Sequence, residues 1–236
     1  MAEAPKGRWV VETLYEEEGF TCAFRADEVR YEEETGQQHL VIFDNALFGR
    51  MMALDGITQV TERDEFIYHE MMTHVPILAH GRVKSVLIIG GGDGGILREV
   101  VRHKSVEHVT MVEIDPAVTD FCKQQLPGIS AGAFDDPRLD LVFADGAKFV
   151  EETERKFDVI IVDSTDPVGP GEVLFREEFY RAAANCLTPG GVIVTQNGVP
   201  FMQGAELGGT IEKFRRLFNV ASCYLATIPT YVGGPM

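Results

Sequence analysis

The feature that most constrains the fold is a regular alternation of apolar, strand-like runs with helical segments after residue 64. The strand-like runs are short and apolar, which is typical of strands in a sheet covered on both faces. They occupy residues 85–90, 108–114, 139–145, 157–163, 191–197 and 221–228. Segments with helical spacing occupy residues 64–80, 94–103, 116–126, 147–153, 177–187 and 205–218. This rhythm predicts an α/β fold, a Rossmann-like doubly wound parallel sheet.

Residues 1–63 have a different character. They contain about six short β-like runs, separated by turn-prone pairs of residues such as Thr-Gly and Asp-Asn. This pattern predicts a small antiparallel β-domain, a meander, before a catalytic domain over residues 64–236. Because so small a β unit leaves strand edges exposed, we expect it to pack against another copy and to serve oligomerisation.

Acidic residues stand at the ends of four of the predicted strands. Asp93 lies in a loop after the first strand, Glu113 ends the second, Asp145 ends the third, and Asp163 ends the fourth with Asp166 close behind it. Ligands of open α/β sheets bind outside the carboxyl ends of the strands, so these acids should converge on one crevice. A turn explains one such acid, but not the whole set.

The loop after the first strand, GGGDGG at residues 90–95, indicates which ligand the crevice accepts. Its glycines let a ligand approach the backbone, and Glu113, twenty residues beyond Asp93, is placed to accept bonds from ribose hydroxyls. Asp93 argues against a pyrophosphate ligand, because its negative charge would repel an anion bound at this loop. It would also repel the carboxylate tail of S-adenosylmethionine but attract an ammonium, which favours decarboxylated S-adenosylmethionine.

Net charge and composition limit the classes of molecule that the protein is expected to bind. A formal charge of −16 makes nucleic acid an unfavourable partner and attracts cations such as polyamines, although many cytosolic proteins are simply acidic. The absence of a long apolar run or an apolar leader predicts a cytoplasmic protein that does not bind a membrane. His69 and His74, five residues apart on a helix, lie about 140° apart around its axis, so we expect no shared metal and no metal cofactor.

Several long motifs resemble the spermidine synthases, the polyamine aminopropyltransferase family. They are VLIIGGGDGGILREV, VEID, ADGAKFV, VDSTDPVGP, LDGITQVTERDEFIYHEM and IPTYVGG, and the likeness runs from about Trp9 to the last residue. The resemblance implies a β-domain followed by a methyltransferase-type Rossmann domain, assembled as a homodimer or homotetramer. It also implies transfer of an aminopropyl group from decarboxylated S-adenosylmethionine to putrescine, giving spermidine and 5′-methylthioadenosine, with no cofactor beyond that co-substrate.

The resemblance also implies roles for individual residues. It assigns the nucleoside donor to residues in several motifs: Gln38, Glu113, Asp145, Gly146 and Pro170. It places the aminopropyl ammonium against Asp93, with Gln59 beside it. The residues that it assigns to the diamine are Tyr68, His69, Asp163, Asp166 and Tyr231.

The charge of putrescine explains the paired acids after the fourth strand. Putrescine is a dication near neutral pH, because alkyl amines titrate near ~10. One nitrogen must lose its proton to attack, and the other must stay charged and be held. We expect Asp163 to accept the proton and Asp166 to help anchor the amine, so that Asp163, Tyr68 and Asp166 form the catalytic group.

Two alternatives remain, and one departure from the family is expected. An S-adenosylmethionine methyltransferase is disfavoured by Asp93, and a catalytically silent polyamine- or nucleoside-binding protein differs from an enzyme only by lacking product formation.

Members of the family continue beyond the IPTYVGG motif with a further strand and helix, whereas this sequence stops at Met236. We therefore expect the C-terminal strand of the sheet to be missing from this chain.

Overall fold

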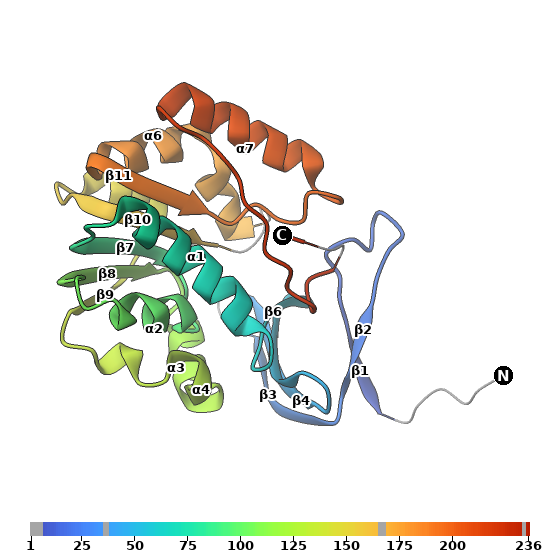
Figure 1. The fold of residues 1–236 in the computed structure, drawn as a ribbon. Coiled ribbons are helices and arrows are strands. Elements are labelled where there is room, and N and C mark those ends of the chain that lie inside the picture. The colour runs from blue at the N-terminus through green and yellow to red at the C-terminus, as the bar shows by residue number, and fades with distance from the viewer. Residues whose placement is uncertain (1–6, 35–37, 165–168, 233–234) are drawn as a thin grey trace. The chain divides into compact units, whose positions relative to one another are not determined.

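The computed structural model describes residues 7–34, 38–164, 169–232 and 235–236. The chain divides into two compact units (Figure 1). The smaller reaches to Glu65 and also includes Pro229–Val232, and the larger contains Phe66–Ile228 together with Met236. The smaller unit therefore includes Asp64, Glu65 and four late residues of the predicted catalytic segment, residues 64–236. Each unit is described by itself below.

The smaller unit consists of antiparallel strands in two sheets. β1 (Arg8–Val11) pairs with β2 (Ala23–Ala26), and β3 (Glu28–Glu34), β4 (His39–Asn45), β5 (Gly49–Leu54) and β6 (Ile57–Thr61) form a four-stranded meander. The sequence predicts these strands but places them in one meander. Among the described residues, the first two strands pair only with each other, and both sheets contribute side chains to one apolar core: Val10, Ala26, Val41, Phe43, Met51 and Ala53.

The larger unit is built on a five-stranded parallel sheet with the order β11-β10-β7-β8-β9. Its strands are β7 (Ser85–Gly90), β8 (His108–Glu113), β9 (Leu139–Phe143), β10 (Phe157–Asp163) and β11 (Leu187–Thr195). The order runs outward in both directions from β7, the first strand of the unit, so the connections reverse direction there. This arrangement confirms the Rossmann-like doubly wound fold.

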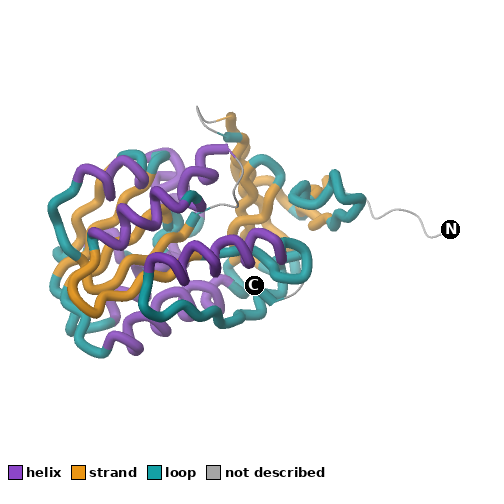
Figure 2. Tube along the Cα trace, turned by 90° about the horizontal axis from the view of Figure 1, so that it is seen from above, coloured by secondary structure: helices purple, strands orange, loops and turns teal. Residues whose placement is uncertain are grey.

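Helices lie on both sides of this sheet (Figure 2). They are α1 (Glu65–His80), α2 (Gly95–Arg102), α3 (Pro116–Gln125), α4 (Pro127–Ser130), α5 (Gly146–Glu152), α6 (Glu177–Asn185) and α7 (Gly204–Leu217), with 3-10 turns η1 (Ala133–Asp135) and η2 (Gly169–Phe175). Alternate strand residues such as Leu87 and Ile160 pack against α5 and α6. Their sequence neighbours, such as Ile88 and Ile161, are also fully buried, so the sheet is covered on both faces.

The predicted strand at residues 221–228 is wrong: the segment forms no strand and pairs with none of the strands that the structure describes. Its Ala226 exchanges two backbone hydrogen bonds with Met236, and the hydroxyl of Tyr224 donates to the carbonyl of Met71. β-Strand preference reflects packing against neighbouring strands, so apolar composition alone does not create a strand. In the described part of the larger unit, β11 pairs with β10 on one side only. No helix among the described residues is long and apolar enough to cross a membrane.

Candidate active site

The carboxyl ends of the parallel strands bring the predicted acids to one edge of the sheet. Asp163 is the last residue of β10 and is in register with Gly90 at the end of β7. Glu113 ends β8, and Asp93 follows β7 within the glycine loop. Asp145 precedes α5 directly after β9. Because parallel strands share one direction, all four acids lie at the same edge.

Several positions of the glycine loop must be glycine, because side chains and backbone of other elements occupy the space that a Cβ would need. Gly90 has a φ of +81°, and a Cβ there would overlap the backbone oxygen of Asp163. A Cβ on Gly92 would lie 2.9 Å from Oε2 of Glu113, and one on Gly95 would overlap the imidazole of His69. The loop thus has a packing role as well as the ligand-binding role expected from the sequence.

Asp163 is held by Tyr68 of α1. The Tyr68 hydroxyl donates to Oδ1 of Asp163 at 2.6 Å, and this hydrogen bond favours the ionised carboxylate. Burial, followed by the charge of Asp93, acts in the opposite direction and raises the pKa of Asp163 to about 6. A carboxylate with a raised pKa is a better proton acceptor than an ordinary aspartate, yet it remains ionised near neutral pH.

Asp93 has the opposite electrostatic character. Its Oδ2 lies 3.3 Å from Nε2 of His69, and its Oδ1 accepts the backbone N–H of Gly95 at 2.8 Å. Burial opposes ionisation, but the charge and hydrogen bond of His69, the N–H of Gly95 and the charge of Arg98 together outweigh it, and the pKa of Asp93 is lowered. The loop therefore carries a fixed negative charge, which suits a cationic ligand group.

Glu113 and Asp145 differ in how much of their hydrogen-bonding capacity the protein already uses. Glu113 is buried and accepts the backbone N–H of Asp115 at 2.9 Å, and burial raises its pKa to about 7. Asp145 caps α5, accepting the N–H groups of Ala147 at 2.8 Å and Lys148 at 3.3 Å. The sequence did not predict this capping role, although Asp before a helix is a common signal for it.

Three predicted site residues belong to the smaller unit: Gln38, Gln59 and Tyr231. The hydroxyl of Tyr231 donates to the backbone oxygen of Gln59 at 2.8 Å. The segment that carries Tyr231 is fixed by buried Asp64, whose Oδ2 accepts both the N–H of Thr230 at 2.9 Å and its hydroxyl at 2.8 Å. Sequence reasoning did not single out Asp64.

Three further predicted residues complete the comparison with the sequence. Gly146 is buried as the first residue of α5, where a Cβ would overlap the side chain of Ile89. Asp166 lies outside the described residues. Pro170 is in η2, and its side chain is outside what the structure describes.

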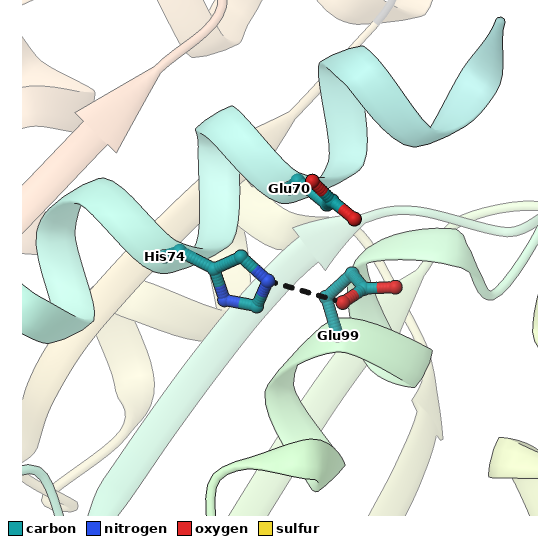
Figure 3. Close-up of side chains that lie close together, drawn as sticks. All are labelled: Glu70, His74 and Glu99. Carbon is teal, nitrogen blue, oxygen red and sulfur yellow. Dashed lines mark ion pairs between the residues drawn. The ribbon is translucent and has the colours of Figure 1, made fainter.

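A cluster of histidine and glutamate side chains lies between α1 and α2. The sequence shows no constellation around His74 or His103 and predicts surface or capping histidines, but in the structure Nδ1 of His74 lies 2.8 Å from Nε2 of His103. Nε2 of His74 is 3.1 Å from Oε2 of the buried Glu99, and Glu70 points toward the same place (Figure 3). The spacing of four between Glu70 and His74, and between Glu99 and His103, was the available signal.

The sheet order, the glycine loop and the acids at the strand ends define a Rossmann-like protein of the nucleoside-binding class. Residues 65–236 match the spermine/spermidine synthase domain, and residues 9–62 match the spermidine synthase tetramerisation domain. The chain belongs to the spermine/spermidine synthase family.

Similar proteins and solved structures agree with this assignment. A polyamine aminopropyltransferase of Ruegeria sp. (strain TM1040) is 64% identical over 97% of this chain and 80% of its own length. Polyamine aminopropyltransferase 1 of Pseudomonas aeruginosa is 61% identical over 95% of this chain and 78% of its own length. A spermidine synthase crystal structure in complex with the transition state analogue AdoDATO superposes with a TM-score of 0.93, at 40% identity, over 100% of this chain and 80% of that one. The spermidine synthase of Thermotoga maritima gives a TM-score of 0.90 at 38% identity, over 100% of this chain and 79% of that one.

Proposed function

We propose that this protein transfers the aminopropyl group of decarboxylated S-adenosylmethionine to putrescine, giving spermidine and 5′-methylthioadenosine. The observation that carries the proposal is Asp163, a carboxylate of raised pKa held by Tyr68 at the edge of a Rossmann-like sheet. The names of its relatives, polyamine aminopropyltransferases and spermidine synthases, support the same reaction.

Charge selects the donor. Asp93 holds the ammonium of the aminopropyl tail, because its lowered pKa keeps it ionised. The carboxylate of S-adenosylmethionine would be repelled there, which disfavours a methyltransferase. We assign the buried Glu113 to the ribose hydroxyls, and we assign Asp145 with Gly146 to the adenine. The assignments of Gln38, Gln59 and Pro170 to the donor remain predictions.

The transfer is a direct displacement. The unprotonated nitrogen of putrescine attacks the carbon next to the sulfonium, a C–N bond forms, the C–S bond breaks, and its electron pair leaves on sulfur as a neutral thioether. Asp163 accepts the proton that the attacking nitrogen gives up. A carboxyl of pKa about 6 accepts that proton at about 3 kcal/mol less cost than one near its ordinary value of 3.8.

The remaining residues hold the partners of this step. Tyr68 orients Asp163, and His69 orients Asp93. A contact of His69 with the diamine, and the anchoring of its second ammonium by Asp166 and Tyr231, remain predictions.

Assembly is part of the proposal. We infer a homodimer or homotetramer formed through the smaller unit, supported by the match of residues 9–62 to a tetramerisation domain. Light scattering coupled to size-exclusion chromatography measures the oligomeric state. A monomer at the protein concentration of the activity assay would contradict the inference. A cytoplasmic location and the absence of nucleic-acid and membrane partners remain predictions.

The test is product formation. The protein is incubated with decarboxylated S-adenosylmethionine and putrescine, and spermidine and methylthioadenosine are measured by mass spectrometry. Asp163→Asn should lose activity by roughly 10²–10⁴-fold, the range for general base catalysis. Asp140→Asn, which changes an exposed carboxylate on β9, is the matched control and should retain full activity.

The alternatives give different results in the same experiment. A methylated amine formed from S-adenosylmethionine would identify a methyltransferase. Stabilisation by methylthioadenosine in thermal denaturation without any spermidine would identify a binding protein. Equal activity of the Asp163 variant and the wild type would remove Asp163 as the base.

A further inference from the structure

Two helices of the larger unit face each other with the same pair of side chains, a glutamate followed four residues later by a histidine. Glu70 and His74 lie on α1. Glu99 lies on α2, and His103 is the residue that follows the last residue of α2. Residues four apart lie on one face of a helix, so each pair presents both side chains together. One ligand atom from each of Glu70, His74 and Glu99 lies within 4.8 Å of the other two (Figure 3).

We propose that Glu70, His74 and Glu99 bind a divalent transition-metal ion of the zinc type. Imidazole nitrogen and carboxylate oxygen bind zinc at about 2.0–2.2 Å, and a tetrahedron with such bonds has edges of about 3.4 Å. The 3.1 Å between Nε2 of His74 and Oε2 of Glu99 is close to such an edge. Three protein ligands leave the fourth position for water. The mixed nitrogen and oxygen ligands favour zinc or cobalt over magnesium or calcium.

His103 supplies the contact that directs His74 toward the ion. Its Nε2 lies 2.8 Å from Nδ1 of His74. When the Nδ1–H of His74 donates to His103, the lone pair on Nε2 of His74 is free for the metal, an arrangement typical of metal-binding histidines.

Two arginines compete with the ion for Glu99. Arg98 donates to Oε1 and Arg102 to Oε2, each at 2.7 Å. The Arg102 side chain is 62% exposed and can turn into solvent, which frees Oε2 for the metal. Arg98 is 17% exposed and is also held by the carbonyl of Ile129, so it stays on Oε1. The ion therefore replaces one surface guanidinium.

The proposed ligands are not among the residues assigned to the transfer reaction, and the proposal does not depend on that reaction. The site joins α1 to α2. We therefore expect a bound ion to raise the thermal stability of the larger unit without taking part in the chemistry.

Cobalt(II) and zinc titrations of the metal-free protein test the proposal. We expect one Co²⁺ per chain, with the visible absorption of four-coordinate cobalt, displaced by Zn²⁺. His74→Ala should abolish this binding, Glu70→Gln should weaken it, and His103→Ala should weaken it about 10–100-fold. Arg102→Gln should tighten binding, because it removes the competing cation.

Two matched variants exclude other binding sites: His108→Ala removes an exposed histidine, and Cys223→Ser removes the exposed thiol. Both should bind cobalt as the wild type does. Far-UV circular dichroism confirms that each variant is folded. The proposal is overturned if the wild type binds no cobalt, if binding survives His74→Ala, or if Cys223→Ser alone removes it.

Discussion

The hydrogen bond from Tyr68 to Asp163 makes a quantitative prediction about pH. Asp163 works as a base only when ionised, so activity should rise with pH through the pKa of Asp163, about 6. Tyr68 lowers this pKa by donating to Oδ1 at 2.6 Å. A hydrogen bond to a charged group contributes about 1.5–3 kcal/mol, which corresponds to about 1–2 pKa units. Tyr68→Phe should therefore move the acid limb upward, from about pH 6 to about pH 7–8.

The assay is the dependence of kcat/KM for putrescine on pH, which reports the pKa values of the free enzyme and free substrate. Above the shifted pKa, the variant should recover much of its activity, because the carboxylate is then ionised and is the stronger base. Tyr224→Phe is the matched control, since the hydroxyl of Tyr224 also bonds to α1, at the carbonyl of Met71. An acid limb that stays in place or moves downward in Tyr68→Phe would refute the reasoning.

Three further predictions concern stability and positioning. Gly95→Ala should destabilise the protein by about 1–3 kcal/mol in denaturant unfolding, because its Cβ would overlap the ring of His69. Asp64→Ala should cost about 1–3 kcal/mol or more by leaving the N–H and hydroxyl of Thr230 without their acceptor, whereas Asp64→Asn should recover part of the loss. Glu113 has a folded pKa of about 7 against an ordinary 4.5, so the folded state binds its proton more tightly and stability falls as pH rises between these values, by about 3 kcal/mol. Glu113→Gln should flatten the pH dependence of the free energy of unfolding and raise that free energy at pH 8. It should also weaken methylthioadenosine binding, measured by calorimetry. An unchanged pH dependence of stability would contradict the burial argument.

Much of the fold could be predicted because its signals are local. The continuous apolar run Val159–Val162 in β10 and the helical spacing in α1 are properties of neighbouring residues, and the structure confirms both elements. The segment 221–228 also contains several apolar residues but pairs with no strand in the described part of the chain. Its state depends on a partner strand, which is not a local property. The same limit applies to His74 and His103, whose contact requires α1 and α2 to pack together.

Apart from the segment 221–228, the sequence by itself determined the alternation of strands and helices, and it placed an acid at the carboxyl end of four strands. Since the strands are parallel, those acids had to gather at one edge of the sheet. Only the tertiary structure decided which donor each acid meets: Tyr68 reaches Asp163 across 95 residues, and His69 reaches Asp93 instead. It also separated their pKa values, with Asp93 lowered, Asp163 raised to about 6 and Glu113 to about 7. The reason is physical: a pKa depends on burial and on charges nearby in space, and neither is a property of the sequence alone.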